Sequence, residues 1–358
     1  VRNRTTGVLY VLDEPSIGLH PRNIAGLTGV MDDLVADGNS VILVDHDTQV
    51  LAKADWLIEM GPGAGADGGE VIAEGTVADL AANPASRIGP FLTGEPDRNL
   101  RPRASAEEMF EKGAISLSTA AIHTVRPLSV RFPKGRLTAV TGVSGSGKTT
   151  LILESLIPGL STAIEGKKPP EHVLTVSAPG IRQVKLIDAT PIGINVRSTV
   201  ATYAGVHDEL RKIFARLPQA KEKGYKAGDF SYNTGSLRCP TCDGTGQISL
   251  DVQFLPDVDI PCPDCRGSRY GKEAEAVLYP APDGKGYSLP QLMAMDVRQA
   301  MEVCSGMKLV RGRLQVLDSL GLGYLTLGEQ TPSLSGGEAQ RLKLASEMGR
   351  PQSDAVFI

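Results

Sequence analysis

The stretch Gly142-Val-Ser-Gly-Ser-Gly-Lys-Thr149 decides the fold class of this 358-residue chain. It fits the phosphate-binding pattern G-x-x-x-x-G-K-[ST], and it lies between an apolar segment, 136–142, and a helix-forming segment, 149–156. In such a loop the backbone N–H groups and the positive end of the next helix bind phosphates. Lys148 would neutralise them and Thr149 would ligate Mg²⁺, so the sequence predicts an α/β nucleotide-binding domain. The expected nucleotide contacts are Gly142, Ser144, Gly145, Ser146, Gly147, Lys148, Thr149 and Thr150.

A second motif, Leu12-Asp-Glu-Pro-Ser-Ile-Gly-Leu-His20, follows an apolar run. Asp13 is expected to hold Mg²⁺, and Glu14 to activate the attacking water as general base. Two acids after a strand could also be a solvated strand end, but the Pro-Ser-Ile-Gly-Leu-His that follows favours a Walker B motif. His46 ends the next apolar run and is expected to contact the γ-phosphate. Glu14 and His46 are therefore the predicted catalytic residues.

Residues 334–341, Leu-Ser-Gly-Gly-Glu-Ala-Gln-Arg, match the signature motif of ABC-type ATPases. Ser335, Gly336 and Gly337 are expected to present the amides of a helix N-terminus to a γ-phosphate. Ser335 and Glu338 also fit a capping box, which is the purely structural alternative. In a single ATPase cassette the P-loop precedes Walker B, whereas here it follows. The chain therefore joins the end of one cassette to the start of a second, or it is a permuted cassette.

Four of the five cysteines form two C-x-x-C pairs, Cys239/Cys242 and Cys262/Cys265, separated by residues 243–261. This spacing predicts a closed Cys₄ site for a structural Zn²⁺. Unmetallated or disulfide-bonded cysteines are the alternative, which a reducing compartment disfavours. Cys304 has no partner in the pattern and is expected in the core.

Hydrophobic periodicity and the turn residues give a coarse map of the elements. Pro158 and Gly159 are expected to end the helix after the P-loop, and Leu342, Ala345 and Met348 to form a buried stripe on the signature helix. No internal repeat is visible. Strands are predicted over 7–12, 40–45, 56–60, 70–76 and 136–142, the first two of them buried, and helices over 22–37, 149–156, 208–217, 289–304, 308–320 and after Ser335.

Composition narrows the function classes. The net charge is −4, so no global basic field indicates nucleic acid. No apolar run reaches the roughly 20 residues that span a bilayer, and no signal peptide opens the chain, so we expect a cytoplasmic protein. The charges of segment 208–217 could simply form a solvated helix face. Basic residues that could contact DNA backbone are Arg211, Lys212, Arg216, Lys221, Lys223, Lys226, Arg266, Arg269 and Lys272.

The chain resembles the UvrA family, a component of the bacterial excinuclease. The resemblance rests on GVLYVLDEPSIGLHPRN, GPGAGADGGEVIAEGT, TGVSGSGKTTL, the CPTC and CPDC pairs with FLPDV between them, and SLSGGEAQRLKLA. It implies a tandem ABC ATPase that uses ATP, Mg²⁺ and structural Zn²⁺. It further implies a homodimer that recognises damaged double-stranded DNA in nucleotide excision repair and loads the partner helicase of the excinuclease. On this basis residues 1–95 match the end of a first cassette, 96–113 a linker, and 114–358 the start of a second, with a zinc module at 239–270.

The sequence departs from the family pattern at one position, because Ala189 follows Asp188 where the Q-loop has glutamine. The chain looks like an internal fragment with half of each of two ATP sites, so its own ATP turnover is expected to be near zero. Three alternatives remain open. They are a permuted cassette that works, a zinc-stabilised DNA-binding module without ATPase activity, and a paralogue tied to resistance against DNA-binding drugs.

Overall fold

The computed structural model describes residues 6–65, 68–93, 102–188, 190–193, 195–250, 258–348 and 354–358. These fall into two units. Unit 1 contains residues 1–185 with 354–356, and unit 2 contains residues 186–353 with 357–358. The cassette boundaries read from the sequence stay predictions, and residues 94–101, next to and within the predicted linker, lie outside the described part.

Unit 1 begins with two parallel strands joined by a helix. The elements are β1 (Leu9–Asp13), α1 (Pro21–Ala36), β2 (Ser40–Val44) and α2 (Thr48–Leu51). Parallel pairing requires a crossover, which α1 supplies. In this register Asp13 lies beside Val44. The acidic motif and His46 therefore lie at the C-terminal ends of two neighbouring parallel strands, on the same side of the sheet.

The prediction that these two strands are buried is wrong, because one face of the pair is open. The side chains of Leu9, Val11, Ile42 and Val44 are between 52% and 63% exposed. Alternate residues of both strands point the other way and are only half-exposed. Side chains alternate between the two faces of a strand, and a sheet of two strands covered on one side leaves the other side to solvent.

The next part of unit 1 is an antiparallel hairpin with two short helices. Its elements are β3 (Leu57–Gly61), β4 (Glu70–Gly75), α3 (Val77–Ala82) and α4 (Gly89–Leu92). Leu57, Ala73 and Leu80 form a small core between them. Glu59 accepts hydrogen bonds from Ser86 and from the Ile88 amide, so the hairpin and α4 are fastened together.

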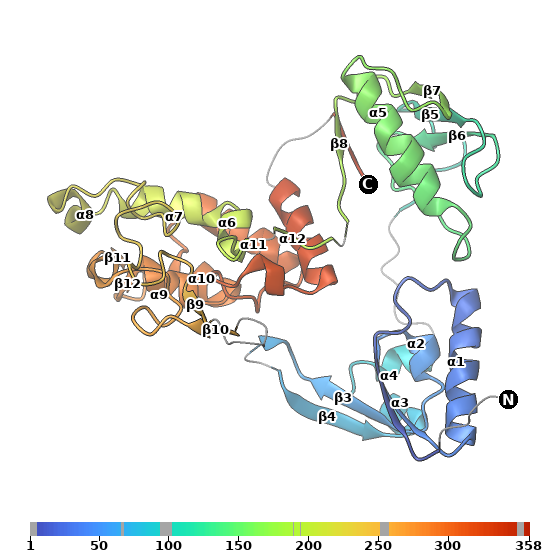
Figure 1. Cartoon of the computed structure of the whole chain (residues 1–358), viewed down its shortest axis with the longest axis horizontal. Helices are drawn as coiled ribbons and strands as arrows, with labels where there is room; N and C mark the ends of the chain where they lie inside the picture. Colours follow the sequence, from blue (N-terminus) through green and yellow to red (C-terminus); the bar gives the residue numbers. More distant parts are fainter. Residues whose placement is uncertain are drawn as a thin grey trace. The chain divides into compact units, whose positions relative to one another are not determined.

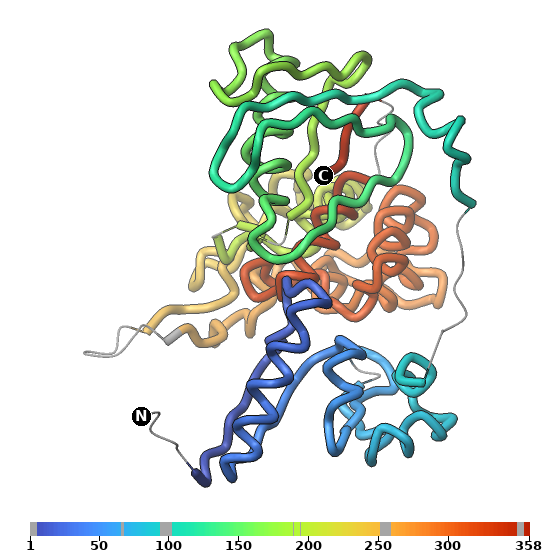
Figure 2. The backbone as a smooth tube through the Cα atoms, turned by 90° about the vertical axis from the view of Figure 1, so that its right-hand side faces the viewer, coloured from blue at the N-terminus to red at the C-terminus, as the bar shows by residue number. Residues whose placement is uncertain are grey.

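The P-loop lies in a lobe that contains a three-stranded antiparallel sheet of order β6–β5–β7. Helix α5 packs on β7 (Figure 1). Figure 2 shows the backbone of this lobe as a tube in teal and green. A separate pair joins β8 to β13. The elements are β5 (Ala114–Thr119), β6 (Leu128–Pro133), the π-helix η2 (Thr150–Leu156), α5 (Ile157–Ile164), β7 (Val173–Ser177), β8 (Gln183–Lys185) and β13 (Ala355–Phe357).

The strand predicted over 136–142 does not form. Within the described residues no strand pairs with this segment, and the Leu137 side chain is 84% exposed. A strand is stabilised by hydrogen bonds to a neighbour and by packing of its side chains, and this segment has neither here. The apolar residues give this segment a propensity to form a strand, but a strand exists only where a neighbouring strand pairs with it.

The helix after the P-loop does not end at Pro158 and Gly159, contrary to the prediction. η2 runs directly into α5, with Pro158 in the first turn of α5. In η2 the Ile157 amide bonds to the Ile152 carbonyl, five residues back, and this wider spacing accommodates the ring and the missing N–H of the proline. Gly159 allows close approach to β7, because a Cβ there would lie 3.3 Å from Cγ1 of Val173.

Unit 2 is mainly helical and carries two short hairpins. Its helices are α6 (Val200–Tyr203), α7 (Val206–Phe214), α8 (Pro218–Glu222), η3 (Lys272–Ala276), α9 (Leu289–Ala294), α10 (Val297–Val303), α11 (Lys308–Ser319), η4 (Thr331–Ser333) and α12 (Gly336–Met348). Its hairpins are β9 (Gln247–Leu250) with β10 (Val258–Pro261), and β11 (Leu278–Pro280) with β12 (Gly286–Ser288).

One large core holds the helices of unit 2 together, and Leu210, Phe214, Leu314, Leu317 and Cys304 are fully buried in it. The expected core position of Cys304 is thereby confirmed. The single helix predicted over 289–304 is wrong. Met295 is extended, and Asp296 starts a new helix with a capping box to Gln299.

The buried stripe predicted for the signature helix is only partly correct. Leu342 is fully buried and Ala345 nearly so, but Met348 is 53% exposed at the last turn. The core of unit 2 ends before that turn. Among the described residues, no helix is long and apolar enough to cross a membrane.

Candidate functional site

The P-loop places its lysine over its own backbone. The Lys148 Nζ donates to the carbonyl of Gly142 at 2.7 Å and to that of Val143 at 3.0 Å. Gly147 has a φ of +89°, and a Cβ there would lie 2.5 Å from Cγ2 of Val125, so only glycine fits. Residues 142–150 therefore form a single loop that leads into η2, and carbonyls of this loop hold the ammonium group of Lys148.

The Walker B end and His46 come together through the parallel pairing of β1 and β2. The Glu14 amide donates to the Val44 carbonyl at 2.7 Å, and Glu14 Oε1 lies 3.8 Å from His46 Nδ1. Both side chains are exposed to solvent. Glu14 has a φ of +44°, a left-handed conformation that non-glycine residues rarely adopt and that is often found at functional sites.

Asp45 connects these two motifs, and sequence reasoning missed it. Its carboxylate accepts the Ser16 hydroxyl at 2.7 Å, the Ser16 amide at 3.2 Å, and the amides of His46 and Asp47 at 2.7 and 2.9 Å. Partial burial opposes ionisation, but the four hydrogen bonds prevail and lower the pKa of Asp45. The sequence contained one signal that could have identified Asp45: an aspartate that ends a predicted strand, one residue before His46.

Replacing Asp45 with asparagine should loosen both motifs in a pH-dependent way. Hydrogen exchange at the Ser16, His46 and Asp47 amides should become roughly 5- to 10-fold faster than in the wild type at pH 7, because bonds to an ionised acceptor are about twice as strong. Since the folded pKa is lowered, the stabilisation exists above the unfolded pKa near 4 and disappears as pH falls through the folded value. The ratio of exchange rates should therefore approach one once the pH has fallen below the folded pKa. A ratio that does not change with pH would contradict this role.

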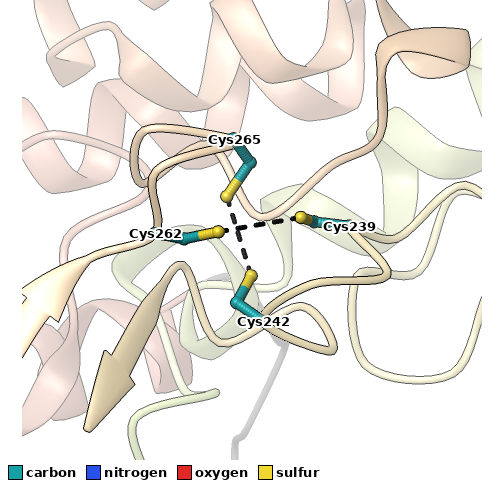
Figure 3. Close-up of side chains that lie close together, drawn as sticks. All are labelled: Cys239, Cys242, Cys262 and Cys265. Atoms are coloured by element: carbon teal, nitrogen blue, oxygen red, sulfur yellow. Dashed lines mark hydrogen bonds between the residues drawn. The ribbon is translucent and has the colours of Figure 1, made fainter. Parts of the chain in front are cut away.

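The four predicted metal ligands converge in unit 2 (Figure 3). The sulfurs of Cys239 and Cys262 are 3.9 Å apart, those of Cys242 and Cys265 are 3.6 Å apart, and all four lie within 4.8 Å of one another. A tetrahedral Zn²⁺ with bonds of about 2.3 Å requires sulfurs about 3.8 Å apart. The cluster thus fits a structural zinc ion with four thiolate ligands and no open position.

The surroundings favour the thiolate at one of the four cysteines, Cys242, whereas burial raises the pKa of Cys239 and raises that of Cys265 to about 12. The Gly246 amide donates to the Cys242 sulfur at 3.3 Å. Although burial opposes ionisation, this bond and the neighbouring Cys265 lower the pKa of Cys242 to about 7. Gly244, with a φ of +78°, passes so close to the Tyr232 carbonyl that a Cβ would overlap it. Thiolates are the metal-binding form of cysteine.

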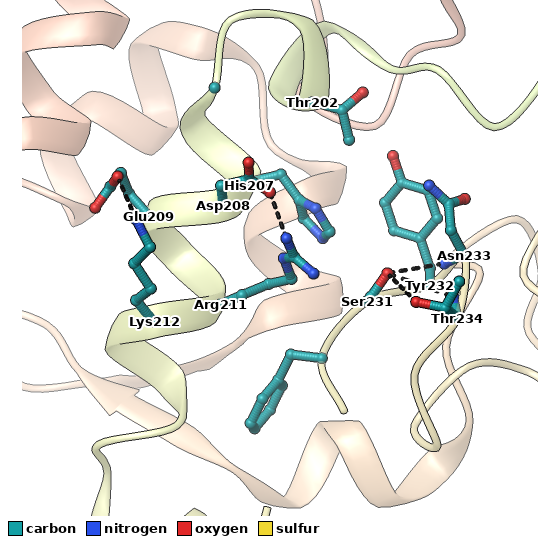
Figure 4. Close-up of polar contacts among 12 residues, drawn as sticks. Thr202, His207, Asp208, Glu209, Arg211, Lys212, Ser231, Tyr232, Asn233 and Thr234 are labelled. Atoms are coloured by element: carbon teal, nitrogen blue, oxygen red, sulfur yellow. Dashed lines mark hydrogen bonds and ion pairs between the residues drawn. The ribbon is translucent and has the colours of Figure 1, made fainter. Parts of the chain in front are cut away.

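Two of the predicted DNA contacts on α7 are neutralised by neighbours. Arg211 pairs with Asp208 at 2.5 Å, and Lys212 pairs with Glu209 at 3.0 Å (Figure 4). Both are i,i+3 pairs, but the Arg211 and Glu209 side chains are only 25% and 18% exposed, so this side of α7 is solvated only at Asp208 and Lys212.

Arg269 cannot contact DNA backbone, so the prediction for this residue is wrong. Its side chain is buried over the Tyr232 ring, 4% exposed, and it donates to the Val196 carbonyl at 3.0 Å. An arginine after a C-x-x-C pair can serve packing as well as binding, and only the tertiary structure distinguishes them.

An open groove of about 870 Å³ lies beside the zinc cluster, and two basic residues, Lys226 and Arg238, line it. Arg238 contacts Asp243 at 2.9 Å and the Asn233 carbonyl at 3.2 Å, which orients its guanidinium. The lining residues of the groove are Lys226, Gly228, Asp229, Thr234, Gly235, Ser236, Arg238, Pro240 and Asp243.

The signature motif forms the capped helix start that the sequence allowed. The Ser335 amide donates to Glu338 Oε2 at 2.7 Å, and the Glu338 amide donates to Ser335 Oγ at 3.3 Å. Further along α12, Lys343 binds Asp188 and the Thr190 carbonyl. The hydrogen bond from Lys343 lowers the pKa of Asp188. Ala189 itself lies outside the described residues.

A short segment, residues 196–201, connects the zinc cluster to the residues before the signature. On one edge Arg269 binds Val196, and Arg197 binds Asp243 at 3.0 Å. On the other edge the Thr331 amide donates to the Ser198 carbonyl at 3.0 Å, four residues before Ser335. We call residues 196–201 the connecting segment.

These features define a class: an ABC-type P-loop ATPase fold with an inserted Cys₄ module that fits zinc. No family model matches the chain. UvrABC system protein A of Thermus thermophilus is 41% identical over 96% of this chain and 36% of that protein, and the Bacillus subtilis protein is 41% identical over 97% and 36%. UvrA2 from Deinococcus radiodurans has a similar structure, with a TM-score of 0.85 and 38% identity over 99% of this chain and 42% of that chain. The chain belongs to the UvrA family and spans about a third of the length of these relatives.

Proposed function

We propose that this chain is part of an ATP-dependent protein that recognises DNA damage in nucleotide excision repair. The observation that carries the proposal is the P-loop with Lys148 held in place, in a chain of the UvrA family that also contains the Cys₄ cluster. Such a protein would act with double-stranded DNA, the partner helicase of the excinuclease and a second copy of itself in the cytoplasm.

The proposed roles of the site residues follow from their positions. Lys148 and the loop amides bind the phosphates of ATP, Thr149 ligates Mg²⁺, and Ser335 with its glycines presents amides to a γ-phosphate. Asp13, Glu14 and His46 belong to a second site, in which Glu14 is the general base. Zinc, when bound by the four cysteines, is structural. Each ATP site of this chain is therefore half of a composite site.

The groove beside the zinc cluster is the proposed contact for the DNA backbone. Lys226 and Arg238 line it, and phosphate contacts from such residues give affinity without sequence preference. Asp243 orients Arg238 at the groove but also offsets its charge, and Asp229 lines the same groove, so a phosphate must compete with these carboxylates for the two basic side chains. The paired Lys212 on α7 provides a matched control with the same charge.

The double variant Lys226→Ala/Arg238→Ala should bind duplex DNA more weakly and with a smaller salt dependence. Removing two phosphate contacts should reduce the slope of log affinity against log salt by about 2. Fluorescence anisotropy between about 50 and 200 mM salt, with damaged and undamaged duplexes, measures this. Lys212→Ala should leave the slope nearly unchanged. An unchanged slope in the double variant would refute the groove as the DNA contact.

A further inference from the structure

Tyr324 reaches the signature helix from the loop between α11 and η4. Its hydroxyl donates to Oε1 of Glu338, the acidic residue of the signature motif. The loop is fixed on both sides of the tyrosine, because Leu322 and Leu325 are buried in the core of unit 2. In addition, the Val297 amide donates to the Leu325 carbonyl at 3.0 Å. Tyr324 therefore binds the signature glutamate from a well-packed position.

Glu338 has both of its carboxylate oxygens engaged. Oε1 accepts the Tyr324 hydroxyl, and Oε2 accepts the Ser335 amide at 2.7 Å. Burial raises the pKa of Glu338, but the hydrogen bonds from these two residues and the nearby charge of Arg341 prevail and lower it. The side chain is therefore ionised at neutral pH and is held at the capping residue.

The first amides of α12 are open beside this carboxylate. The first N–H groups of a helix have no partner within the helix, and Gly336 and Gly337 are both exposed. Within the described part of the chain, a Cβ on Gly337 would meet no atom within 4 Å. The Ser335 Oγ accepts the Glu338 amide at 3.3 Å and keeps its own proton for another acceptor. Two amides and one hydroxyl are therefore available to an anion.

The charge of Glu338 conflicts with such an anion. The positive end of a helix attracts any negative group, whether it is a side chain of the helix or a ligand. A mobile carboxylate at the third position of α12 would turn over the amides of Gly336 and Gly337 and compete with a phosphate for them. The Ser335 amide moves with the helix start, so only the bond from Tyr324 fixes the carboxylate from outside.

We propose that Tyr324 is a positioning residue of the signature motif, which holds the Glu338 carboxylate away from the first amides of α12 and leaves them available to a terminal phosphate. The proposal rests on the role of Ser335, Gly336 and Gly337 proposed above. It adds a residue outside the motif that controls the charge within it.

The test follows the binding of inorganic phosphate to the whole chain at single amides. With ¹⁵N-labelled glycine, the NMR signals of Gly336 and Gly337 report phosphate at the signature separately from the P-loop. Tyr324→Phe removes only the hydroxyl. It should weaken phosphate binding at these amides by about 2- to 5-fold, the effect of one carboxylate at a helix N-terminus.

A second background separates charge from packing. Glu338→Gln keeps the capping box, because glutamine also accepts the Ser335 amide, but it removes the charge. When Tyr324→Phe is added to Glu338→Gln, the phosphate affinity should stay nearly unchanged, since no carboxylate is left to compete. Tyr287→Phe is the matched control, because it removes a hydroxyl that donates to Asp283 at 2.7 Å in the hairpin of β11 and β12. It should bind phosphate like the wild type.

The outcomes distinguish this inference from the role of the signature itself. If neither glycine amide of the wild type responds to phosphate, the proposed role of the signature is wrong and the inference fails with it. If both respond, but Tyr324→Phe binds phosphate as tightly as the wild type, only the role of Tyr324 is refuted. An equal loss in the Glu338 and Glu338→Gln backgrounds would also refute it, because it indicates lost packing rather than a released charge.

Discussion

A chain in which serine replaces Cys242 is expected to lose zinc and to loosen the residues before the signature motif. Its zinc content should fall from about one ion per chain to near zero, because a structural site requires all four thiolates. The free energy of structural zinc binding is large, on the order of 10 kcal/mol in small domains, so this should be among the strongest single-residue effects in the molecule.

The expected consequence reaches the signature through the connecting segment, residues 196–201. Arg269 and Asp243, which follow the two knuckles, hold one edge of this segment. On its other edge, the Thr331 amide bonds to Ser198 and the Val200 amide bonds to Glu329. When the knuckles open, this segment loses its fixed edge, while the apolar core around Leu314 and Leu317 stays intact.

Hydrogen exchange measures this directly. The Thr331 and Val200 amides should exchange about 10-fold faster or more, a local loss of at least about 1.4 kcal/mol, while the middle of α11 keeps its protection. Cys304→Ala is the matched control, since it removes a buried cysteine outside the cluster and should leave the zinc content unchanged. Normal zinc content in Cys242→Ser, or normal protection at Thr331 after zinc loss, would contradict the account.

Replacing Lys148 with alanine should weaken ATP binding by about 10- to 100-fold. The side chain supplies the charge of the loop, and hydrogen bonds to charged groups contribute about 1.5–3 kcal/mol each. The Gly142 and Val143 carbonyls already hold its Nζ. The side chain therefore loses little conformational freedom when ATP binds, and its contribution to the affinity is reduced only slightly. Calorimetry with Mg²⁺-ATP is the measurement. Lys168→Ala, an exposed lysine of the same lobe, should bind ATP like the wild type. Equal affinity of Lys148→Ala and wild type would remove the P-loop from the proposed function.

The sequence predicted well the local structure of segments whose residues are contiguous or regularly spaced. The P-loop is a single stretch, the signature cap is an i,i+3 pattern, and the cysteine knuckles have a spacing that suits one metal. In each case local chain geometry brings the groups together, so little depends on distant packing. The helices at 208–217 and 308–320 were likewise found close to their predicted bounds, as α7 and α11, because their apolar periodicity is strong.

Predictions failed where a distant pairing partner or an unrecognised local hydrogen-bond pattern decides the outcome. Segment 136–142 has strand composition but no paired neighbour among the described residues, and Pro158 continues a helix because η2 precedes it. Met295 looked like part of one long helix until the Asp296 capping box divided it. At 136–142 the strand propensity of each residue is a fraction of a kcal/mol, and the missing partner outweighs it. At Pro158 and Asp296 the deciding feature is local, the wider hydrogen-bond spacing of η2 and the i,i+3 capping box, and the sequence analysis did not recognise it.

The sequence by itself determined that this chain has a P-loop, a Walker B motif, a signature and a Cys₄ cluster, because each is written in residues close together in the chain. Only the tertiary structure decided how they are connected. It placed Asp45 between Ser16 and His46, buried Arg269 under the connecting segment, and brought Tyr324 to Glu338 of the signature. These links join residues between one and 73 positions apart. Most depend on strand pairing and core packing, which no local pattern records.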